Sequence, residues 1–284
     1  MDPTSRRVLA NGLQHHVLEW DGGGTTTVLC LHGFLDLSWA FHQVAPRLAA
    51  AGDHVVAPDL RGPGETERVG AGGYYHFMDY VLDVADLADA LGRERLALVG
   101  HSMGGHIVGY FAGAFPDRAW KAVLMEGIRV VELAPESMPR RVEEWIHGVR
   151  RAREHGPKLY RSVEDAAARM RAHDPRCPPD EALFLAARGT ARVDGGWAYR
   201  HDPLHLTRAP YSFRTDHAMA FWRNVRCPVL LLDGSESERV PIDYPQRLAC
   251  FGDRRHRVVE GAGHMMLRHR PEEVARAVLE FFSE

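Results

Sequence analysis

Short apolar runs alternate with segments of helical periodicity along most of the chain. Four runs are rich in Val, Leu and Ala without alternating polar positions: residues 25–34, 54–60, 96–100 and 119–125. Such runs are typical of strands that are buried on both faces. Three segments between them place apolar residues at helical spacing: residues 39–50, 74–91 and 103–115. This alternation predicts an α/β fold with a mostly parallel central sheet and helices on both faces.

A hairpin is predicted ahead of this alternation. Residues 6–10 and 13–20 have the character of two short strands, and Asn11-Gly12 joins them. This dipeptide favours the tight turns that connect antiparallel strands. We therefore expect the sheet to begin with an antiparallel pair.

The alternation stops after Glu126 and resumes near residue 218. The stretch between is helical in pattern and shows no clear strand, and it has breaks at Pro135, Pro139, Pro157, Pro175, Pro178 and Pro179. The strand-like run CPVLLLDG, a short helix, the run RVVEG and a last helix at residues 271–282 follow. We predict one core domain of residues 1–126 and 218–284, with residues 127–217 inserted as a helical cap.

Composition restricts the class of partner. The 284 residues include 35 Lys+Arg and 38 Asp+Glu, a net charge of -3, without the basic excess typical of proteins that bind nucleic acid or anionic membranes. No apolar run approaches the about 20 residues that span a bilayer. The first residues lack the apolar core of a signal peptide, and the four cysteines are scattered, which favours a reducing, cytoplasmic location. We expect a small neutral partner and make no prediction of oligomeric state.

Seventeen histidines raise the question of a metal site. The cysteines lack the paired spacing of a zinc module. His15 and His16 lie on a predicted strand, where neighbouring side chains point to opposite faces, and the chain has no H-E-x-x-H sequence. We therefore predict neither a metal nor another cofactor.

The stretch LVGHSMGG, residues 98–105, contains the most specific motif. Its G-x-S-x-G sequence falls between a predicted strand and a predicted helix, where this motif forms a sharp turn that presents a nucleophilic serine. Glycines flank the serine because side chains there would collide with neighbouring backbone. Ser102 is therefore the candidate nucleophile, at the amino end of the next helix.

With this motif the chain resembles the α/β-hydrolase family over nearly its whole length. The loop CLHGFLD resembles the family's oxyanion loop, in which the backbone N–H of Phe34 would act together with that of Met103. EGAGHMM places His264 where the family has its catalytic base. PDLRGPGET resembles a structural turn of the family. The resemblance implies an α/β-hydrolase fold with an inserted cap.

The acid of the predicted triad has two candidate locations. The family often has G-x-x-D after the penultimate strand, but here Ser237 occupies the acidic position and Glu236 and Glu238 lie one residue to either side. Glu126 instead follows the strand before the insertion, at the carboxyl edge of the sheet. MEGIRVVELAPESMPRR and RGTARVDGGWAYRHDPLHL resemble the serine hydrolase-like subgroup, which has an acidic residue at that position. We favour Glu126 and keep Glu236 and Glu238 as alternatives.

These features predict a serine hydrolase that cleaves carboxylic esters of small to medium, largely apolar substrates through an acyl-enzyme. Lactone, thioester and carbon–carbon bond hydrolysis use the same triad and stay open. A ligand-binding protein with vestigial turnover is the alternative outside enzymes. Four residues near the elbow or in the cap are candidates for the substrate pocket: His32, His101, Trp145 and Trp197.

Overall fold

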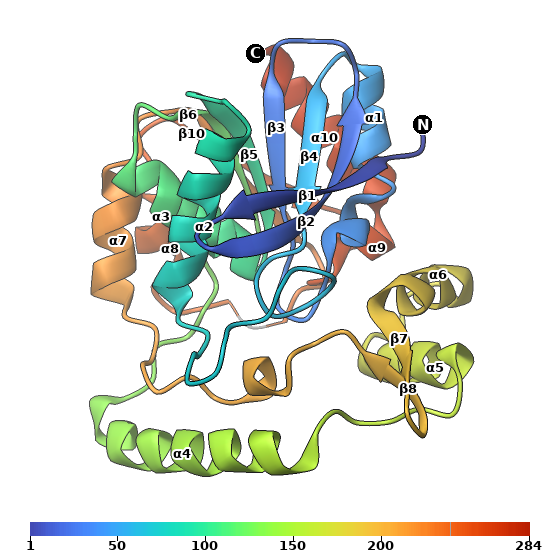
Figure 1. The fold of residues 1–284 in the computed structure, drawn as a ribbon. Coiled ribbons are helices and arrows are strands. Elements are labelled where there is room, and N and C mark those ends of the chain that lie inside the picture. Colours follow the sequence, from blue (N-terminus) through green and yellow to red (C-terminus); the bar gives the residue numbers. More distant parts are fainter. Residues whose placement is uncertain (239) are drawn as a thin grey trace.

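An eight-stranded sheet forms the centre of the molecule in the computed structural model, which describes residues 1–238 and 240–284 (Figure 1). The strand order is β1-β2-β4-β3-β5-β6-β9-β10. The strands are β1 (Thr4–Ala10), β2 (Leu13–Asp21), β3 (Thr27–Leu31), β4 (His54–Pro58), β5 (Leu96–His101), β6 (Ala119–Met125), β9 (Val229–Gly234) and β10 (Arg254–Val259). Strands β4 to β10 in this order pair in parallel, and β2 pairs antiparallel with both β1 and β4. The predicted fold class is confirmed.

The β1–β2 turn has the expected hairpin geometry. Asn11 and Gly12 both adopt positive φ, 46° and 70°, as the two-residue turn that matches strand twist requires. The Asn11 side chain also donates to the carboxylate of Asp83 at 2.9 Å. The local sequence and a contact to the helix layer therefore favour the same turn.

Strand β3 shows why the central strands lack polar alternation. Leu29 and Leu31 belong to the apolar core on one face of the sheet, and Val28 and Cys30 belong to the core on the other face. All four side chains are fully buried. Because successive side chains point to opposite faces, a strand covered on both sides must be apolar throughout.

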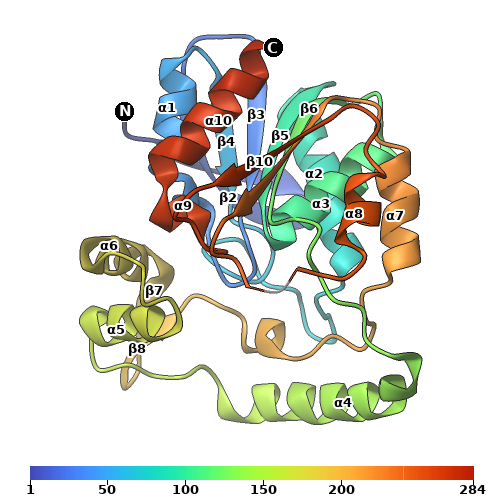
Figure 2. The same cartoon turned by 180° about the vertical axis from the view of Figure 1, so that it is seen from behind.

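Helices cover the two faces (Figures 1 and 2). One core includes side chains of α2 (Phe77–Ala90), α3 (Met103–Ala114), α7 (Thr215–Arg223) and α8 (Tyr244–Leu248). The other core includes side chains of the short 3₁₀ helix η1 (Ser38–Phe41), α1 (Ala45–Ala50), α9 (Met266–His269) and α10 (Pro271–Ser283). These layers fix the carboxyl ends of β5, β6 and β9 at one edge of the sheet.

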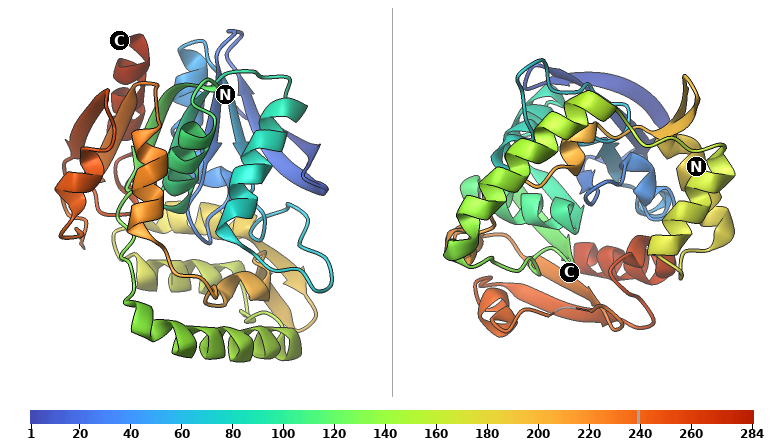
Figure 3. Two further views of the ribbon diagram at one scale, coloured as in Figure 1. Left: turned by 90° about the vertical axis from the view of Figure 1, so that its left-hand side faces the viewer. Right: turned by 90° about the horizontal axis from the view of Figure 1, so that it is seen from below.

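The segment between β6 and α7 lies below this edge in Figure 1 and extends across it when seen from below in Figure 3. It contains η2 (Pro135–Ser137), α4 (Met138–His155), α5 (Val163–His173), α6 (Pro179–Gly189), β7 (Thr190–Val193), β8 (Gly196–Tyr199) and η3 (Pro203–Leu206). The expectation that it contains no strand is wrong, because β7 and β8 pair as a hairpin. Each strand has only four residues, too few for an alternating pattern to stand out. The predicted boundary at residue 217 falls inside α7.

None of the helices in residues 1–238 and 240–284 has both the length and the apolar character that crossing a membrane requires.

Candidate active site

The turn between β5 and α3 holds Ser102 in a strained conformation. Its φ of 52° and ψ of -114° are unusual for a residue with a side chain. A Cβ at Gly100 would lie 2.3 Å from the Gly104 carbonyl oxygen, and one at Gly104 would lie 2.0 Å from the Leu31 carbonyl oxygen. The two glycines are therefore needed for the helix to start so close to β3, and this start exposes the serine hydroxyl at the sheet edge.

The imidazole of His264 connects this serine to a carboxylate. Its Nε2 lies 3.0 Å from the Ser102 Oγ, and its Nδ1 lies 3.5 Å from an oxygen of Glu126. The first distance is that of a good hydrogen bond, and the second is at the long limit. Ser102, His264 and Glu126, which were predicted from distant segments of the sequence, therefore lie together.

Two other histidines hold the loop that carries His264. The Nε2–H of His101 donates to the His264 backbone oxygen at 2.7 Å. On the other side, the Gly263 N–H donates to Nδ1 of His269 at 3.1 Å. His269 also binds Asp174 of the inserted segment through Nε2, at 2.9 Å. The inserted segment is thus connected to the loop that positions the imidazole.

Glu126 is buried at the end of β6, with 4% of its surface exposed and a positive φ of 54°. One carboxylate oxygen accepts the Gly234 N–H at 2.9 Å. Burial by itself would raise the pKa of this carboxyl, but His264, the Gly234 N–H, Ser237 and the Arg129 guanidinium together outweigh burial and lower the pKa. Glu126 is therefore ionised at neutral pH.

The alternative acids lie elsewhere. Glu236 is exposed and forms an ion pair with Arg176 of the inserted segment at 2.6 Å. Glu238 is exposed too, and the described residues include no hydrogen bond from either glutamate to His264. Ser237 faces the Glu126 carboxylate and helps lower its pKa. The structure thus brings Glu126, and neither Glu236 nor Glu238, within hydrogen-bond distance of His264 among the described residues.

Two backbone amides beside Ser102 are available as donors. In the described part of the chain, the N–H groups of Phe34 and Met103 have no hydrogen-bond acceptor. Met103 is the first residue of α3, where an N–H has no partner inside the helix. Phe34 lies just before a sharp turn in which Leu35 has a φ of 59°. A Cβ added to Gly33, the residue before Phe34, would lie 3.3 Å from the Ser102 Cβ, so the loop that carries the Phe34 N–H lies against the serine turn.

The four candidate pocket residues do not line the cavity at Ser102. His32 is buried, where Nδ1–H donates to the Gly33 carbonyl at 2.8 Å and Nε2 accepts the Leu60 N–H at 2.9 Å. It therefore orders the oxyanion loop. His101 is buried under the His264 loop, as described above. Trp145 packs edge-on against Tyr74, and Trp197 pairs through its backbone with Tyr160.

The cavity that opens at Ser102 has a volume of about 510 Å³. Five segments contribute to its wall, namely the elbow with α3, the segment after β6, the end of α5, the loop after β9 and the loop before α9 with α9 itself. The lining residues are Ser102, His106, Glu126, Arg129, Val130, His173, Asp174, Arg176, Glu236, Glu238, Gly263, His264, Met265 and His269. His106 was not among the residues predicted for the pocket, although helical periodicity places it one turn after Ser102. The described residues contain no group of three or more potential ligands suited to a metal ion.

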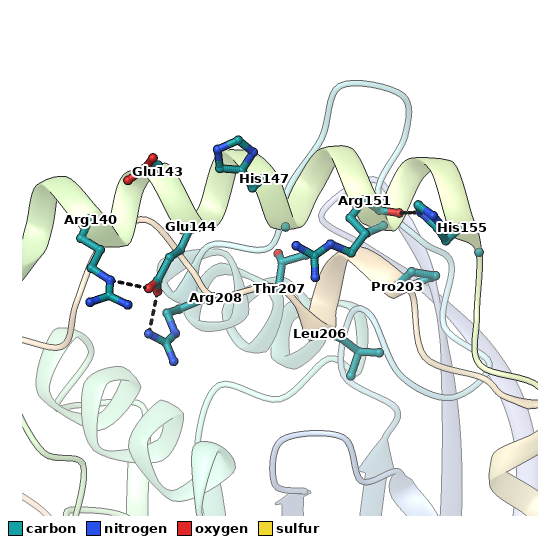
Figure 4. Close-up of a pocket in the computed structure, with 13 residues that line it drawn as sticks. Arg140, Glu143, Glu144, His147, Arg151, His155, Pro203, Leu206, Thr207 and Arg208 are labelled. Carbon is teal, nitrogen blue, oxygen red and sulfur yellow. Dashed lines mark hydrogen bonds and ion pairs between the residues drawn. The ribbon is translucent and has the colours of Figure 1, made fainter.

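A second cavity, of about 650 Å³, lies between α4 and η3 (Figure 4). Its wall is strongly charged, and Glu144 binds both Arg140 at 3.0 Å and Arg208 at 2.7 Å. None of the Ser102, His264 and Glu126 side chains lines it. Although it is larger, it does not contain the candidate chemistry.

The chain is similar in sequence and in structure to several known proteins. A family model described as alpha/beta hydrolase fold matches residues 26–270. A serine hydrolase-like protein of Danio rerio is 29% identical over 273 residues, which cover 92% of this chain and 83% of that protein. Epoxide hydrolase A of Mycobacterium tuberculosis is 27% identical over 325 residues, covering 99% and 98%. A crystal structure of a hypothetical protein from Pseudomonas aeruginosa covers 100% of both chains with a TM-score of 0.88 and 28% identity.

Proposed function

Because the chain belongs to the α/β-hydrolase family, we propose that it is a serine hydrolase that cleaves carboxylic esters. The observation that carries the proposal is the 3.0 Å contact between Ser102 Oγ and His264 Nε2, beside two backbone N–H groups that lack acceptors. A serine hydroxyl becomes a good nucleophile when a neighbouring base removes its proton. His264 has the position for this role.

In the acylation step, Ser102 Oγ attacks the ester carbonyl while its proton passes to His264 Nε2. Glu126 accepts from Nδ1–H and stabilises the imidazolium that forms. The Phe34 and Met103 N–H groups bind the oxyanion of the tetrahedral intermediate, each stabilising it by about 3 kcal/mol. The carbon–oxygen bond to the alcohol then breaks, and His264 gives the proton to the leaving alcohol.

In the deacylation step, a water molecule attacks the acyl group on Ser102. His264 removes a proton from that water and then returns it to Ser102 Oγ as the acid leaves. The products are one alcohol and one carboxylic acid, and the reaction needs no redox partner. Every proton transfer uses the same nitrogen, which explains why one histidine is enough.

The cavity supports a substrate of small to medium size. Its volume of about 510 Å³ lies in the usual range for small-molecule sites. The two arginines on its wall are each paired with a glutamate: Arg129 with Glu126 at 3.3 Å and Arg176 with Glu236 at 2.6 Å. A neutral acyl group therefore fits this wall better than an anionic one.

A serine nucleophile distinguishes this chain from enzymes that open epoxides by forming an ester on a carboxylate. The relative in Mycobacterium tuberculosis is named epoxide hydrolase A, but Ser102 occupies the nucleophile position here. Lactones and thioesters would be attacked by the same serine and are the alternative substrate classes. Carbon–carbon bond hydrolysis is a further alternative, and ligand binding with vestigial turnover is the alternative outside enzymes.

The four cysteines are free and buried, which supports the expected cytoplasmic location.

A panel of p-nitrophenyl esters from acetate to octanoate tests the proposal. We expect turnover that the Ser102→Ala variant lowers by at least about 10³-fold. An organophosphonate should also add one phosphonyl group to the protein, with Ser102 as the modified residue by peptide mass spectrometry. Equal rates for wild type and Ser102→Ala on esters, lactones and thioesters would contradict a serine hydrolase.

A further inference from the structure

The mechanism does not use His106, a buried titratable side chain of the cavity wall. His106 lies on α3, where its backbone N–H donates to the Ser102 carbonyl at 3.1 Å. It is therefore one helical turn from the nucleophile. The same cavity is lined by His106, Ser102 and His264. An acyl group bound to Ser102 can therefore extend toward this residue within the cavity.

The imidazole of His106 has no hydrogen-bond partner. It is 3% exposed, and within residues 1–238 and 240–284 neither Nδ1 nor Nε2 makes a hydrogen bond. A buried polar group without a partner costs about 1–3 kcal/mol. His101 and His269 differ from His106 in this respect, because both make hydrogen bonds to the loop that carries His264.

His106 is surrounded by aromatic rings. The rings of Phe77 and Phe213 stand edge-on to the imidazole, with centroids at 6.3 and 5.3 Å. The indole of Trp222 lies at 6.1 Å. Phe213 is only half-buried and lies on the loop before α7, whereas Trp222 is fully buried. Three aromatic rings therefore surround the imidazole, and the buried Arg247 guanidinium lies over the Phe213 ring, 5.5 Å from its centroid.

Burial lowers the pKa of His106 to about 3, and the nearby Arg247 guanidinium acts in the same direction. The imidazole is therefore neutral at physiological pH and offers one N–H donor and one nitrogen acceptor. A neutral group of this kind suits an uncharged hydrogen-bonding partner. It does not supply the positive charge that would offset the burial of an anion.

We propose that His106 is a specificity-determining residue that binds an uncharged oxo or hydroxyl group on the acyl chain of the substrate. This inference rests on the proposed serine hydrolase function and names the class of acyl group. An apolar stem contacts the aromatic rings, and the polar group farther along the chain makes the hydrogen bond that His106 lacks. Sites built around such a bond discriminate strongly against analogues that lack the polar group.

Matched pairs of esters test this proposal. The pairs are p-nitrophenyl pentanoate with 4-oxopentanoate, and hexanoate with 5-oxohexanoate. In each pair one methylene becomes a carbonyl. The measured quantity is the ratio of kcat/KM for the oxo ester to that for the alkyl ester, in wild type and in His106→Leu. Dividing one ratio by the other cancels the intrinsic reactivity of the esters.

We expect the wild-type ratio to exceed the His106→Leu ratio by about tenfold or more for at least one pair, with His106→Asn or His106→Gln restoring part of the preference. Tyr110→Phe is the matched control. This residue is buried one turn further along α3 and does not line the cavity, so the ratio should not change. Equal ratios in wild type and His106→Leu would overturn the proposal.

Thermal unfolding gives a second, independent readout. If the imidazole is unpartnered until substrate binds, His106→Leu should melt at or above the wild-type temperature. A variant that melts several degrees lower or does not fold would show that His106 has a structural role, and the proposal would be wrong. If wild type and Ser102→Ala hydrolyse the alkyl esters equally, the serine hydrolase proposal itself fails. Ser102-dependent hydrolysis without oxo preference rejects only the role of His106.

Discussion

The guanidinium of Arg129 lies 3.3 Å from the carboxylate of Glu126, three residues earlier in the chain. Arg129 also donates through Nε to Asp233 of β9 at 3.1 Å. The side chain therefore links the end of β6, the first residues of the inserted segment and the neighbouring strand. Because Glu126 is nine-tenths buried, this cation is part of what keeps the carboxylate ionised beside His264.

Arg129→Met should shift the pH dependence of activity. Arg129 lowers the pKa of Glu126, so its loss raises that pKa and a higher pH is needed to ionise the carboxylate. We expect the acidic limb of the kcat/KM profile to move to higher pH, so that activity falls more at the acidic end of the profile than at neutral pH and above. Profiles of kcat/KM from pH 5 to 9 measure this, with Arg129→Lys as the charge-conserving control. An Arg129→Met profile of unchanged shape would contradict the role.

Replacing the carboxylates separately tests the identity of the triad acid. Glu126→Gln should lower kcat by roughly 10³- to 10⁴-fold, because the neutral amide no longer stabilises the imidazolium. Glu238→Gln is the matched control and should change kcat less than about threefold. Steady-state kinetics on one p-nitrophenyl ester decide between them. If Glu126→Gln retains full activity, our assignment is wrong.

Gly104→Ala should prevent the elbow from forming as it does here. The added Cβ would lie 2.0 Å from the Leu31 carbonyl oxygen and 2.8 Å from that of His32, so backbone atoms rather than flexible side chains would have to shift. We expect a loss of more than about 3 kcal/mol in the free energy of unfolding. The control is Gly252→Ala, whose added Cβ has no atom within 4 Å. Urea unfolding followed by circular dichroism measures both, and equal stabilities would refute the packing argument.

The lowered pKa of Asp59 makes the stability of the protein depend on pH. It is buried and accepts from His16 at 2.8 Å and from the backbone N–H of Ser38 at 2.7 Å. Burial alone would raise its pKa, but His16 and the backbone donors outweigh burial and lower it. A lowered carboxyl pKa contributes stability above the unfolded value of about 4, and this contribution is lost as the pH falls through the folded value.

The free energy of unfolding of Asp59→Asn, measured as a function of pH, tests this dependence. At pH 7 we expect this variant to be less stable than wild type by about 2–4 kcal/mol, because a buried acceptor of several hydrogen bonds is altered. The difference should shrink as the pH falls below about 4, where the unfolded chain binds a proton that the folded carboxyl does not, and it should be smallest below the lowered folded pKa. Asp86→Asn, at a carboxylate that accepts one hydrogen bond from Asn11, is the control. A difference between wild type and Asp59→Asn that does not vary with pH would contradict the interpretation.

Local sequence patterns were enough to predict some parts of the structure and not others. The β1–β2 turn and the turn at Ser102 were predictable because a few consecutive residues decide each of them. The β7–β8 hairpin was missed because four-residue strands carry no clear periodicity. Trp145 and Trp197 were candidates for the pocket only because they are large and aromatic, and such residues pack inside a cap as readily as they line a cavity.

The sequence by itself determined the fold class, since fully apolar strands that alternate with helices have few other ways to be buried. It also singled out Ser102, because a G-x-S-x-G turn between a strand and a helix exposes its serine. Tertiary structure decided which glutamate faces His264. Glu126 and Glu236 come from different strand ends, and only the register of β6 against β9 brings Glu126 next to the Gly234 N–H. Tertiary structure also decided which residues form the cavity wall. These residues come from five separate segments that meet only where the inserted segment contacts the sheet edge.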